Sequence, residues 1–183
     1  MKLGSEELYI IRNQVIQPYC GKAIEGACLE VSIGELRSLC STELYGFIKA
    51  GMGDRSTPRS IPEPPDRECV MGEEGWILNP WQYYLLVTAE SVHVPTDLIG
   101  TVAPRSTLLR SGIIVEHTTV SPGWNGKLTF GIANLSRNIF WLSVGARIAG
   151  IELEELKNQS SDAAYAGQSQ GGRVSCAGPE KQV

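Results

Sequence analysis

Short segments rich in β-branched and aromatic residues, separated by glycine and proline, run along most of this 183-residue chain. Residues 27–33 (ACLEVSI) alternate in hydrophobicity with a period of two. Residues 83–94 (YYLLVTAESVHV) are rich in strand formers and predict one long strand or two short ones. Further strands are expected at 76–78, 98–102, 113–115, after Gly126 and at 146–153. So many short strands joined by turns predict a mainly β fold, either a β-barrel or a distorted jelly roll.

The remaining segments predict two helices, an irregular region and a tail. Ser5 can cap a short helix whose first turn holds Glu6 and Glu7 and which ends before Pro18, and a small helix is expected between strands. Residues 46–75 contain four prolines among charged residues and predict a loop or insertion within a β domain spanning 1–156. Residues 157–183 have few large apolar side chains and predict a flexible tail. A turn is expected at 142–145.

Composition excludes several classes of function. A net charge of −4 argues against general binding to nucleic-acid backbones, for which a basic surface supplies most of the affinity. The sequence contains no run of 18 apolar residues, so no membrane span is predicted, and the cytoplasm is the expected location. The five cysteines form no C-x-x-C pair, so neither a zinc site nor a redox dithiol is expected. We therefore expect no metal ligands, no nucleic acid and no membrane as partners.

Residues 105–134 carry the densest set of groups able to bind an anion. The stretch begins RSTLLRSG, with two arginines and three hydroxyls, and an apolar strand and a polar turn with PGW follow. Guanidinium groups make short bidentate hydrogen bonds to phosphate oxygens. The backbone edge of a β-hairpin beside them could contact a planar base. The stretch therefore predicts a site for an anionic, nucleotide-like ligand.

This stretch also resembles a known family. RSTLLRSG resembles the RSSLARLG box of the dCTP deaminases and the RSGLA box of the trimeric dUTPases, and PGWNGKLTFGIAN resembles the segment that follows in those enzymes. The similarity continues in GACLEVSIG (26–34), LVTAESVHVPTDLIG (86–100), VGARIAGIELEEL (144–156) and the tail DAAYAGQSQGG (162–172). Several matches in the same order are more specific than one motif.

The resemblance implies a dUTPase-like fold and a homotrimer with active sites between subunits. It also implies a deoxynucleoside triphosphate carrying Mg²⁺, over which the tail closes. The residues that it assigns to the phosphates are Arg105, Ser106, Thr107, Arg110 and, from the tail, Gln168. It places Trp124 near the base or sugar, and Thr118 and Thr119, in the hairpin that should approach the base, are expected in the same pocket. The residues alone leave other interpretations open, because the arginines could form interface ion pairs and Trp124 could be core.

The chain departs from the family at positions that carry chemistry. The family's deaminases have a glutamate that shuttles protons where this chain has Gly131, which offers no side-chain proton. Both enzyme groups have an aspartate where this chain has Ser121. The lysine before the tail tyrosine in deaminases is Ala164 here, and the hairpin between Gly112 and Trp124 is shorter than in typical deaminases.

Two residues in that hairpin could replace the missing acids. Glu116 and His117 lie next to each other, and histidine titrates near neutral pH, so the pair could activate a water molecule. Neighbouring residues of a strand point to opposite faces, so at most one of them would enter a pocket. An exposed hairpin tip without a catalytic role is the alternative.

Three hypotheses follow from these residues. The protein could process a pyrimidine deoxynucleoside triphosphate, converting dCTP to dUTP or dUTP to dUMP. It could instead be a catalytically inactive paralogue that binds nucleotide as a sensor or regulatory subunit. Thirdly, it could be a purely structural trimer, although the retained arginines and tail glutamine argue against this.

Overall fold

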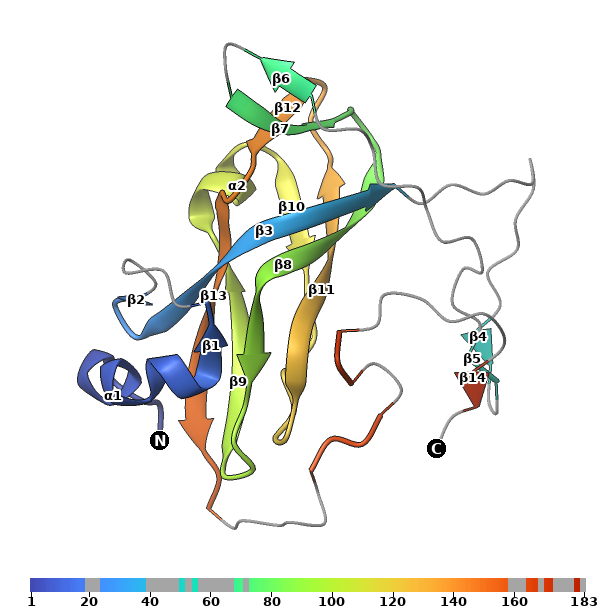
Figure 1. Cartoon of the computed structure of the whole chain (residues 1–183). Helices are drawn as coiled ribbons and strands as arrows, with labels where there is room; N and C mark the ends of the chain where they lie inside the picture. Colours follow the sequence, from blue (N-terminus) through green and yellow to red (C-terminus); the bar gives the residue numbers. More distant parts are fainter. Residues whose placement is uncertain are drawn as a thin grey trace.

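Eight strands form one sheet that curves back on itself in the computed structural model of the chain (Figure 1). The structure describes residues 1–18, 24–38, 50–51, 54–55, 68–70, 73–157, 164–167, 170–172 and 180–181. The strands of this sheet are β1 (Ile16–Gln17), β2 (Ile24–Glu25), β3 (Cys28–Ser38), β8 (Tyr83–His93), β9 (Leu98–Pro104), β10 (Ile113–Glu116), β11 (Asn125–Asn134) and β13 (Arg147–Glu155). The order is β10-β11-β8-β3-β13-β9, with β1 beside β8 and β2 beside β3, and all these pairs are antiparallel.

The two ends of this order almost meet. Gly100 of β9 donates to the carbonyl of Val120 at 2.9 Å, and Val120 donates back at 2.8 Å. A Cβ added at Gly100 would lie 3.0 Å from Cβ of Val120, so the glycine permits this close approach. The sheet is therefore a nearly closed barrel, and the predicted mainly β fold is confirmed.

The barrel interior holds a continuous apolar core. Strand β8 alternates between buried and less buried positions over much of its length, as expected for a strand with one face toward a core. The largest fully buried side chains on the barrel strands include Leu29, Ile33, Leu36, Leu86, Ile132, Ile148 and Ile151. Each such side chain stabilises the fold by about 1.5–3 kcal/mol relative to an exposed one. Residues 83–93 form one strand, which settles the choice left open by the sequence.

Both expected helices are present. Helix α1 spans Ser5–Val15 and buries Leu8 and Val15 against the barrel. Its N-cap is Gly4 rather than Ser5, because the Glu7 side chain accepts a hydrogen bond from the Gly4 amide at 2.7 Å. The small helix α2 spans Ser106–Arg110, so it contains most of the predicted phosphate-binding residues.

Two small sheets lie outside the barrel. One consists of β12 (Phe140–Ser143), β7 (Glu73–Leu78) and β6 (Glu68–Val70), and the other of β14 (Glu180–Lys181), β5 (Asp54–Arg55) and β4 (Ala50–Gly51). The turn expected at 142–145 is shorter, because residues 142 and 143 belong to β12. Several of these strands fall within the loop predicted at 46–75, most of whose remaining residues lie outside the described part. Its irregular character stays a prediction.

Candidate functional site

The hairpin of β10 and β11 divides partway along its length. The two strands pair from Ile113 with Asn134 as far as Glu116 with Gly131. Beyond that pair the chain turns away from β11, and Val120 pairs with β9 instead. Residues 127–130 of β11 therefore face a gap where β10 would otherwise continue. We call this opening the hairpin gap, bounded by residues 117–121 on one side and 127–130 on the other.

The C-terminal tail reaches the same edge of β11 at the far end of the hairpin gap. Gly171 forms a parallel bridge with Gly126 and donates to the Asn125 carbonyl at 2.9 Å. The Asn125 amide donates to Oε1 of Gln170 at 3.1 Å, and Nε2 of Gln170 donates to the Gly123 carbonyl at 2.9 Å. The tail thus binds residues 123–126 in the way that a short strand would. It covers the end of the gap that lies away from the paired part of β10 and β11.

Two aromatic rings hold this tail contact together. The Trp124 and Tyr165 rings lie 5.2 Å apart at an interplanar angle of 50°, a tilted geometry that suits aromatic pairs. Nε1 of Trp124 donates to the Gly126 carbonyl at 3.1 Å. Gly123 has φ +77°, and a Cβ there would lie 2.9 Å from that of Ala164. Only glycine suits both the turn and the approach of the tail.

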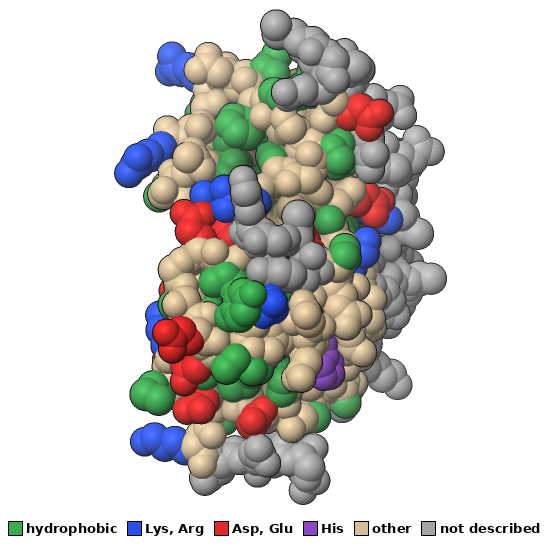
Figure 2. Space-filling model, turned by 60° about the vertical axis from the view of Figure 1, so that its left-hand side comes forward, with side chains coloured by type: hydrophobic (Ala, Val, Ile, Leu, Met, Phe, Trp, Pro, Cys, Tyr) green, Lys and Arg blue, Asp and Glu red, His purple; other side chains and the backbone are tan. Residues whose placement is uncertain are grey.

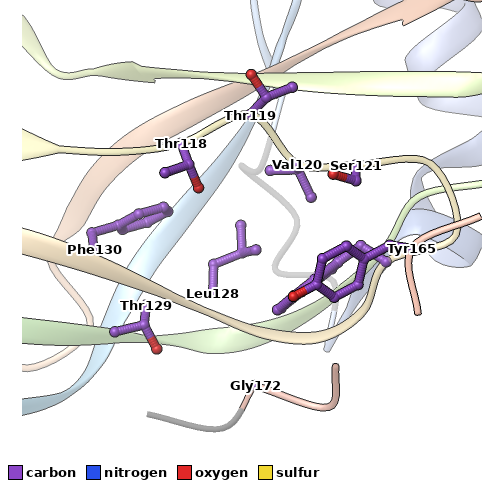
Figure 3. Close-up of a pocket in the computed structure, with 10 residues that line it drawn as sticks. Thr118, Thr119, Val120, Ser121, Leu128, Thr129, Phe130, Tyr165 and Gly172 are labelled. Carbon is purple, nitrogen blue, oxygen red and sulfur yellow. The ribbon is translucent and has the colours of Figure 1, made fainter. Parts of the chain in front are cut away.

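A cavity of about 280 Å³ occupies the hairpin gap (Figure 3). Leu128 and Phe130 point toward the facing segment, and Tyr165 lies at the end near Ser121. The residues that line it are Thr118, Thr119, Val120, Ser121, Trp124, Leu128, Thr129, Phe130, Tyr165 and Gly172. Hydroxyls and apolar side chains share this lining, and none of these residues is acidic. Such a mixture is typical of a small-molecule site, and the volume is near the lower limit of about 300 Å³ for ligand pockets.

The arginine box, residues 105–111, lies elsewhere on the barrel. It begins directly after β9, and Ser106, Thr107 and Arg110 are exposed on α2. Gly100, which pairs with Val120 beside the cavity, precedes Arg105 by five residues of extended chain, or about 16 Å. In one chain, therefore, the arginine box and the cavity are well separated.

Arg105 is held by acidic side chains of the β2–β3 hairpin. Nη1 donates to the buried carboxylate of Glu30, which is 8% exposed, and to Glu25 at 3.2 Å. Arg147 donates to the same Glu25 oxygen at 3.0 Å and lies 3.9 Å from Glu30. Burial lowers the pKa of Arg105, but the bonds and charges of Glu30 and Glu25 outweigh it and raise the pKa. Arg105 therefore has an internal counter-ion in this structure.

The Tyr83 hydroxyl lies at the closed end of the hairpin gap, where Glu116 and Gly131 form the last pair of β10 and β11. A Cβ added at Gly131 would be 2.0 Å from the hydroxyl oxygen of Tyr83, so this hydroxyl occupies the space of a side chain at position 131. Burial, and then the charge of Glu116, raise the pKa of Tyr83. Sequence reasoning missed Tyr83, because only the strand register places its ring over Gly131.

No group of three metal-ligating side chains occurs among the residues that the structure describes. Within the same ranges, no helix is long and apolar enough to span a membrane. Figure 2 shows basic and acidic side chains interspersed on one face rather than gathered into a basic patch.

Comparison with known proteins decides the family. A family model described as dCTP deaminase-like matches residues 9–156. The chain belongs to the dCTP deaminase-like family. A dCTP deaminase of Rhodospirillum rubrum is 33% identical over 173 residues, covering 88% of this chain and 86% of that protein. One from Idiomarina loihiensis is 27% identical over 152 residues, covering 78% of each.

One solved structure supports the fold. The dCTP deaminase of Agrobacterium tumefaciens superposes with a TM-score of 0.60 at 15% identity, over 83% of this chain. The match covers 47% of that longer chain, so this protein spans about half of it. A native EIAV dUTPase covers 56% of this chain with a TM-score of 0.42. The resemblance to the dCTP deaminase and dUTPase superfamily inferred from the sequence is confirmed.

Within this dCTP deaminase-like chain, the structure brings together one part of the predicted site. Thr118, Thr119 and Trp124 all line the cavity. Ser121, at the family's aspartate position, lines it as well. Glu116 and His117 are exposed and do not line it, although Glu116 lies directly opposite Gly131. The catalytic role suggested for Glu116 and His117 stays a prediction.

The tail contributes residues that the sequence did not single out. Gln168 lies outside the described residues, whereas Gln170 binds the turn beside the cavity. The two glutamines are two positions apart, and nothing in the sequence alone distinguishes them. Tyr165, the tail tyrosine that follows Ala164, packs on Trp124 and lines the cavity.

Proposed function

We propose that this protein binds a pyrimidine deoxynucleoside triphosphate and processes it, converting either dCTP to dUTP and ammonia or dUTP to dUMP and pyrophosphate. The observation that carries the proposal is the cavity in the hairpin gap, lined by the residues that we expected near the base and sugar. Membership of the dCTP deaminase-like family supports the class of ligand.

The base would lie in the hairpin gap. Strand β11 pairs with β8 along one edge, while residues 127–130 face the gap along the other. Backbone amides and carbonyls at such an edge form directional hydrogen bonds in the plane of the sheet, which suits a flat ring. The hydroxyls of Thr118 and Thr119 add adaptable donors and acceptors.

The phosphates would bind the arginine box of a second copy. The cavity is small, and the box of the same chain lies about 16 Å away along β9. A homotrimer with its sites between subunits would bring the hairpin gap of one chain to the arginine box of another. Ser106, Thr107 and Arg110 are exposed and available for this, and the tail would cover the ligand.

Magnesium would enter with the triphosphate. The described residues include no group of three acidic, histidine or cysteine side chains that could hold the ion. Phosphate oxygens and water are the ligands that Mg²⁺ prefers. The residues present therefore fit an ion held by the nucleotide, which would reduce the charge that the arginine box must neutralise.

A catalytically inactive nucleotide-binding protein, acting as a sensor or regulatory subunit, is the second candidate. The specific observation in its favour is that none of the residues lining the cavity is acidic. A well-placed general acid or base contributes about 10²–10⁴-fold to a rate. With Ser121 and Gly131 at the family's acidic positions, turnover would depend on groups outside this lining.

Turnover distinguishes the two candidates. Purified protein would be incubated with dCTP, dUTP or dTTP and Mg²⁺, and the products separated by anion exchange. Formation of dUTP from dCTP, or of dUMP from dUTP, supports the enzyme. Binding by calorimetry without any product, at enzyme concentrations near that of the substrate, supports the inactive paralogue. Absence of both binding and product contradicts the proposed ligand.

Subunit mixing tests the shared site. We expect Arg110→Ala and Trp124→Ala each to weaken nucleotide binding, because one impairs the phosphate side and the other the base side. Mixed trimers of the two variants would contain sites with neither change and would recover part of the binding. Light scattering would establish the oligomeric state, and no recovery in proven mixed trimers would contradict a site between subunits.

A further inference from the structure

The closed end of the hairpin gap is formed by one pair of residues and a tyrosine from the neighbouring strand. Glu116 and Gly131 are the last residues paired between β10 and β11. Tyr83 of β8 pairs with Ala133 of β11, so its side chain emerges on the same face as Gly131 and reaches diagonally across to it. A Cβ added at Gly131 would lie 2.0 Å from the Tyr83 hydroxyl oxygen and 2.8 Å from Cζ. The tyrosine can occupy this place only because residue 131 has no side chain.

The Tyr83 hydroxyl is accessible and chemically versatile. The residue is 42% exposed, although it comes from a strand in the middle of the sheet order. A phenol both donates and accepts a hydrogen bond. A phenol with its ordinary pKa of about 10 is already protonated at neutral pH, and burial and the charge of Glu116 raise the pKa of Tyr83 further, so the hydroxyl keeps both abilities.

The same end of the gap adjoins the cavity. Thr129 and Phe130 line the cavity, and Gly131 is the next residue along the strand. On the facing segment Thr118 lines it, two residues beyond Glu116. A flat ring entering between the divided strands would stop where the strands rejoin, at Glu116 and Gly131. The group that such a ring meets there is the Tyr83 hydroxyl, with the Glu116 carboxylate across the pair.

We propose that Tyr83 recognises the inner edge of the bound pyrimidine, acting from β8 across Gly131. This inference rests on the proposed function and adds to it a specificity-determining residue that belongs neither to the arginine box nor to the cavity lining. The hydroxyl can accept from an exocyclic amino group or donate to a carbonyl oxygen, so it suits either cytosine or uracil. Gly131 and Tyr83 then act as one unit, since any side chain at 131 displaces the hydroxyl.

The first test measures binding of dCTP and of dUTP, each with Mg²⁺, by calorimetry. Tyr83→Phe keeps the ring over Gly131 and removes only the hydroxyl. We expect it to weaken binding of the preferred nucleotide by about 3- to 10-fold, as for loss of one hydrogen bond between uncharged groups. The matched control is Tyr84→Phe, the same change on the opposite face, where the hydroxyl accepts from the Asn79 amide at 3.0 Å. That control is expected to lower thermal stability and leave affinity unchanged.

The second test uses the contact between positions 83 and 131. Gly131→Ala in the wild-type background should displace the hydroxyl and weaken binding about as much as Tyr83→Phe. In a Tyr83→Ala background, the same Gly131→Ala change meets no hydroxyl and should have no further effect on affinity. Such non-additivity is the signature of two residues in contact. Circular dichroism would verify that each variant is folded.

The outcomes separate this inference from the function on which it rests. If wild-type protein binds a pyrimidine nucleotide and Tyr83→Phe binds it equally well, the role of Tyr83 is wrong and the proposed function stands. If the wild-type protein binds no nucleotide, both are wrong. Additive effects of Tyr83→Ala and Gly131→Ala on affinity would also contradict the inference.

Discussion

The hairpin gap is enclosed by segments of a single chain, whereas the arginine box has one arginine paired within the chain and one exposed. At the hairpin gap, two segments and the tail enclose a cavity, and backbone hydrogen bonds from the tail hold it in shape. At the arginine box, Arg105 binds acidic residues of its own chain, whereas Arg110 is exposed on α2. The residues that resemble a phosphate motif are thus divided between a structural and an available arginine. A motif match alone does not reveal this division.

Arg105→Ala would show the structural role most strongly. The change leaves the Glu30 carboxylate buried, with Arg147 as a distant partner at 3.9 Å. We expect a loss of about 3 kcal/mol in the free energy of unfolding, as for breaking a buried ion pair from one side. This corresponds to a fall in Tm of about 6–12 °C for a domain of this size.

Glu25→Gln is the control for that change, because Glu25 is largely exposed and its ion pairs with Arg105 and Arg147 are screened by water. It should cost less than about 1 kcal/mol. Equal losses for the two variants in denaturant titrations would remove the distinction between a buried and a surface pair.

Arg110→Ala should give the opposite result. Among the described residues Arg110 makes no ion pair, so its removal should leave the unfolding midpoint unchanged. If it binds phosphate, affinity for the preferred triphosphate should fall by about 10- to 100-fold, as for loss of a hydrogen bond to a charged group. Calorimetry on Arg110→Ala and Arg137→Ala, a second exposed arginine outside the box, would compare a site change with a simple loss of charge.

Tyr165→Ala tests whether the tail belongs to the hairpin gap. Losing the ring contact with Trp124 should cost about 1 kcal/mol. The larger expected effect is faster tryptic cleavage after the exposed Lys157, because the tail would leave the turn more often. Tyr9→Ala, an exposed tyrosine on α1, should leave the cleavage rate unchanged. Equal cleavage of wild type and Tyr165→Ala would mean that the ring does not hold the tail.

The smallest expected effect concerns Cys28, whose thiol pKa responds to the charge of Glu30, the buried partner of Arg105. Burial, and then the charges of Glu152 and Glu30, raise the pKa of its thiol. If nucleotide binding draws Arg105 away from Glu30, the carboxylate is less neutralised and the thiol pKa rises further. At a fixed pH near 8 less thiolate is present, so alkylation of a variant retaining only Cys28 should slow. A control that also carries Glu152→Gln should be alkylated faster both with and without nucleotide, and nucleotide should slow it to the same extent. If nucleotide leaves the alkylation rate of Cys28 unchanged, Arg105 stays bound to Glu30.

The sequence was sufficient for the barrel because its strands carry their own signals. Alternating apolar residues marked β3, and strand formers such as those in YYLLV marked β8. The division of the hairpin had no such signal. Nothing in residues 116–121 (EHTTVS) shows that the chain leaves β11 after Glu116. The departure depends on the pairing of Val120 with Gly100 of β9, a strand that precedes these residues in the sequence.

The candidate site residues show the same limit more sharply. Thr118, Thr119 and Trp124 were predicted from one local stretch of sequence and lie together at the cavity. The partner of Arg105, Glu30, is 75 residues away in sequence and becomes its neighbour only through strand order. Tyr83 reaches Gly131 from a different strand. Contacts of this kind require register, which the pattern of a single segment does not fix.

The unpaired edge of β11 also affects how the protein behaves at high concentration. A strand edge with free amides and carbonyls is a template on which another chain can add a strand, the usual start of β-sheet aggregation. Here the uncovered length is only residues 127–130, because β10 covers one side of it and the Gly126–Gly171 bridge the other. The tail therefore shortens the strand edge on which another chain could pair. Removing it would lengthen the exposed edge and make the chain more prone to precipitate.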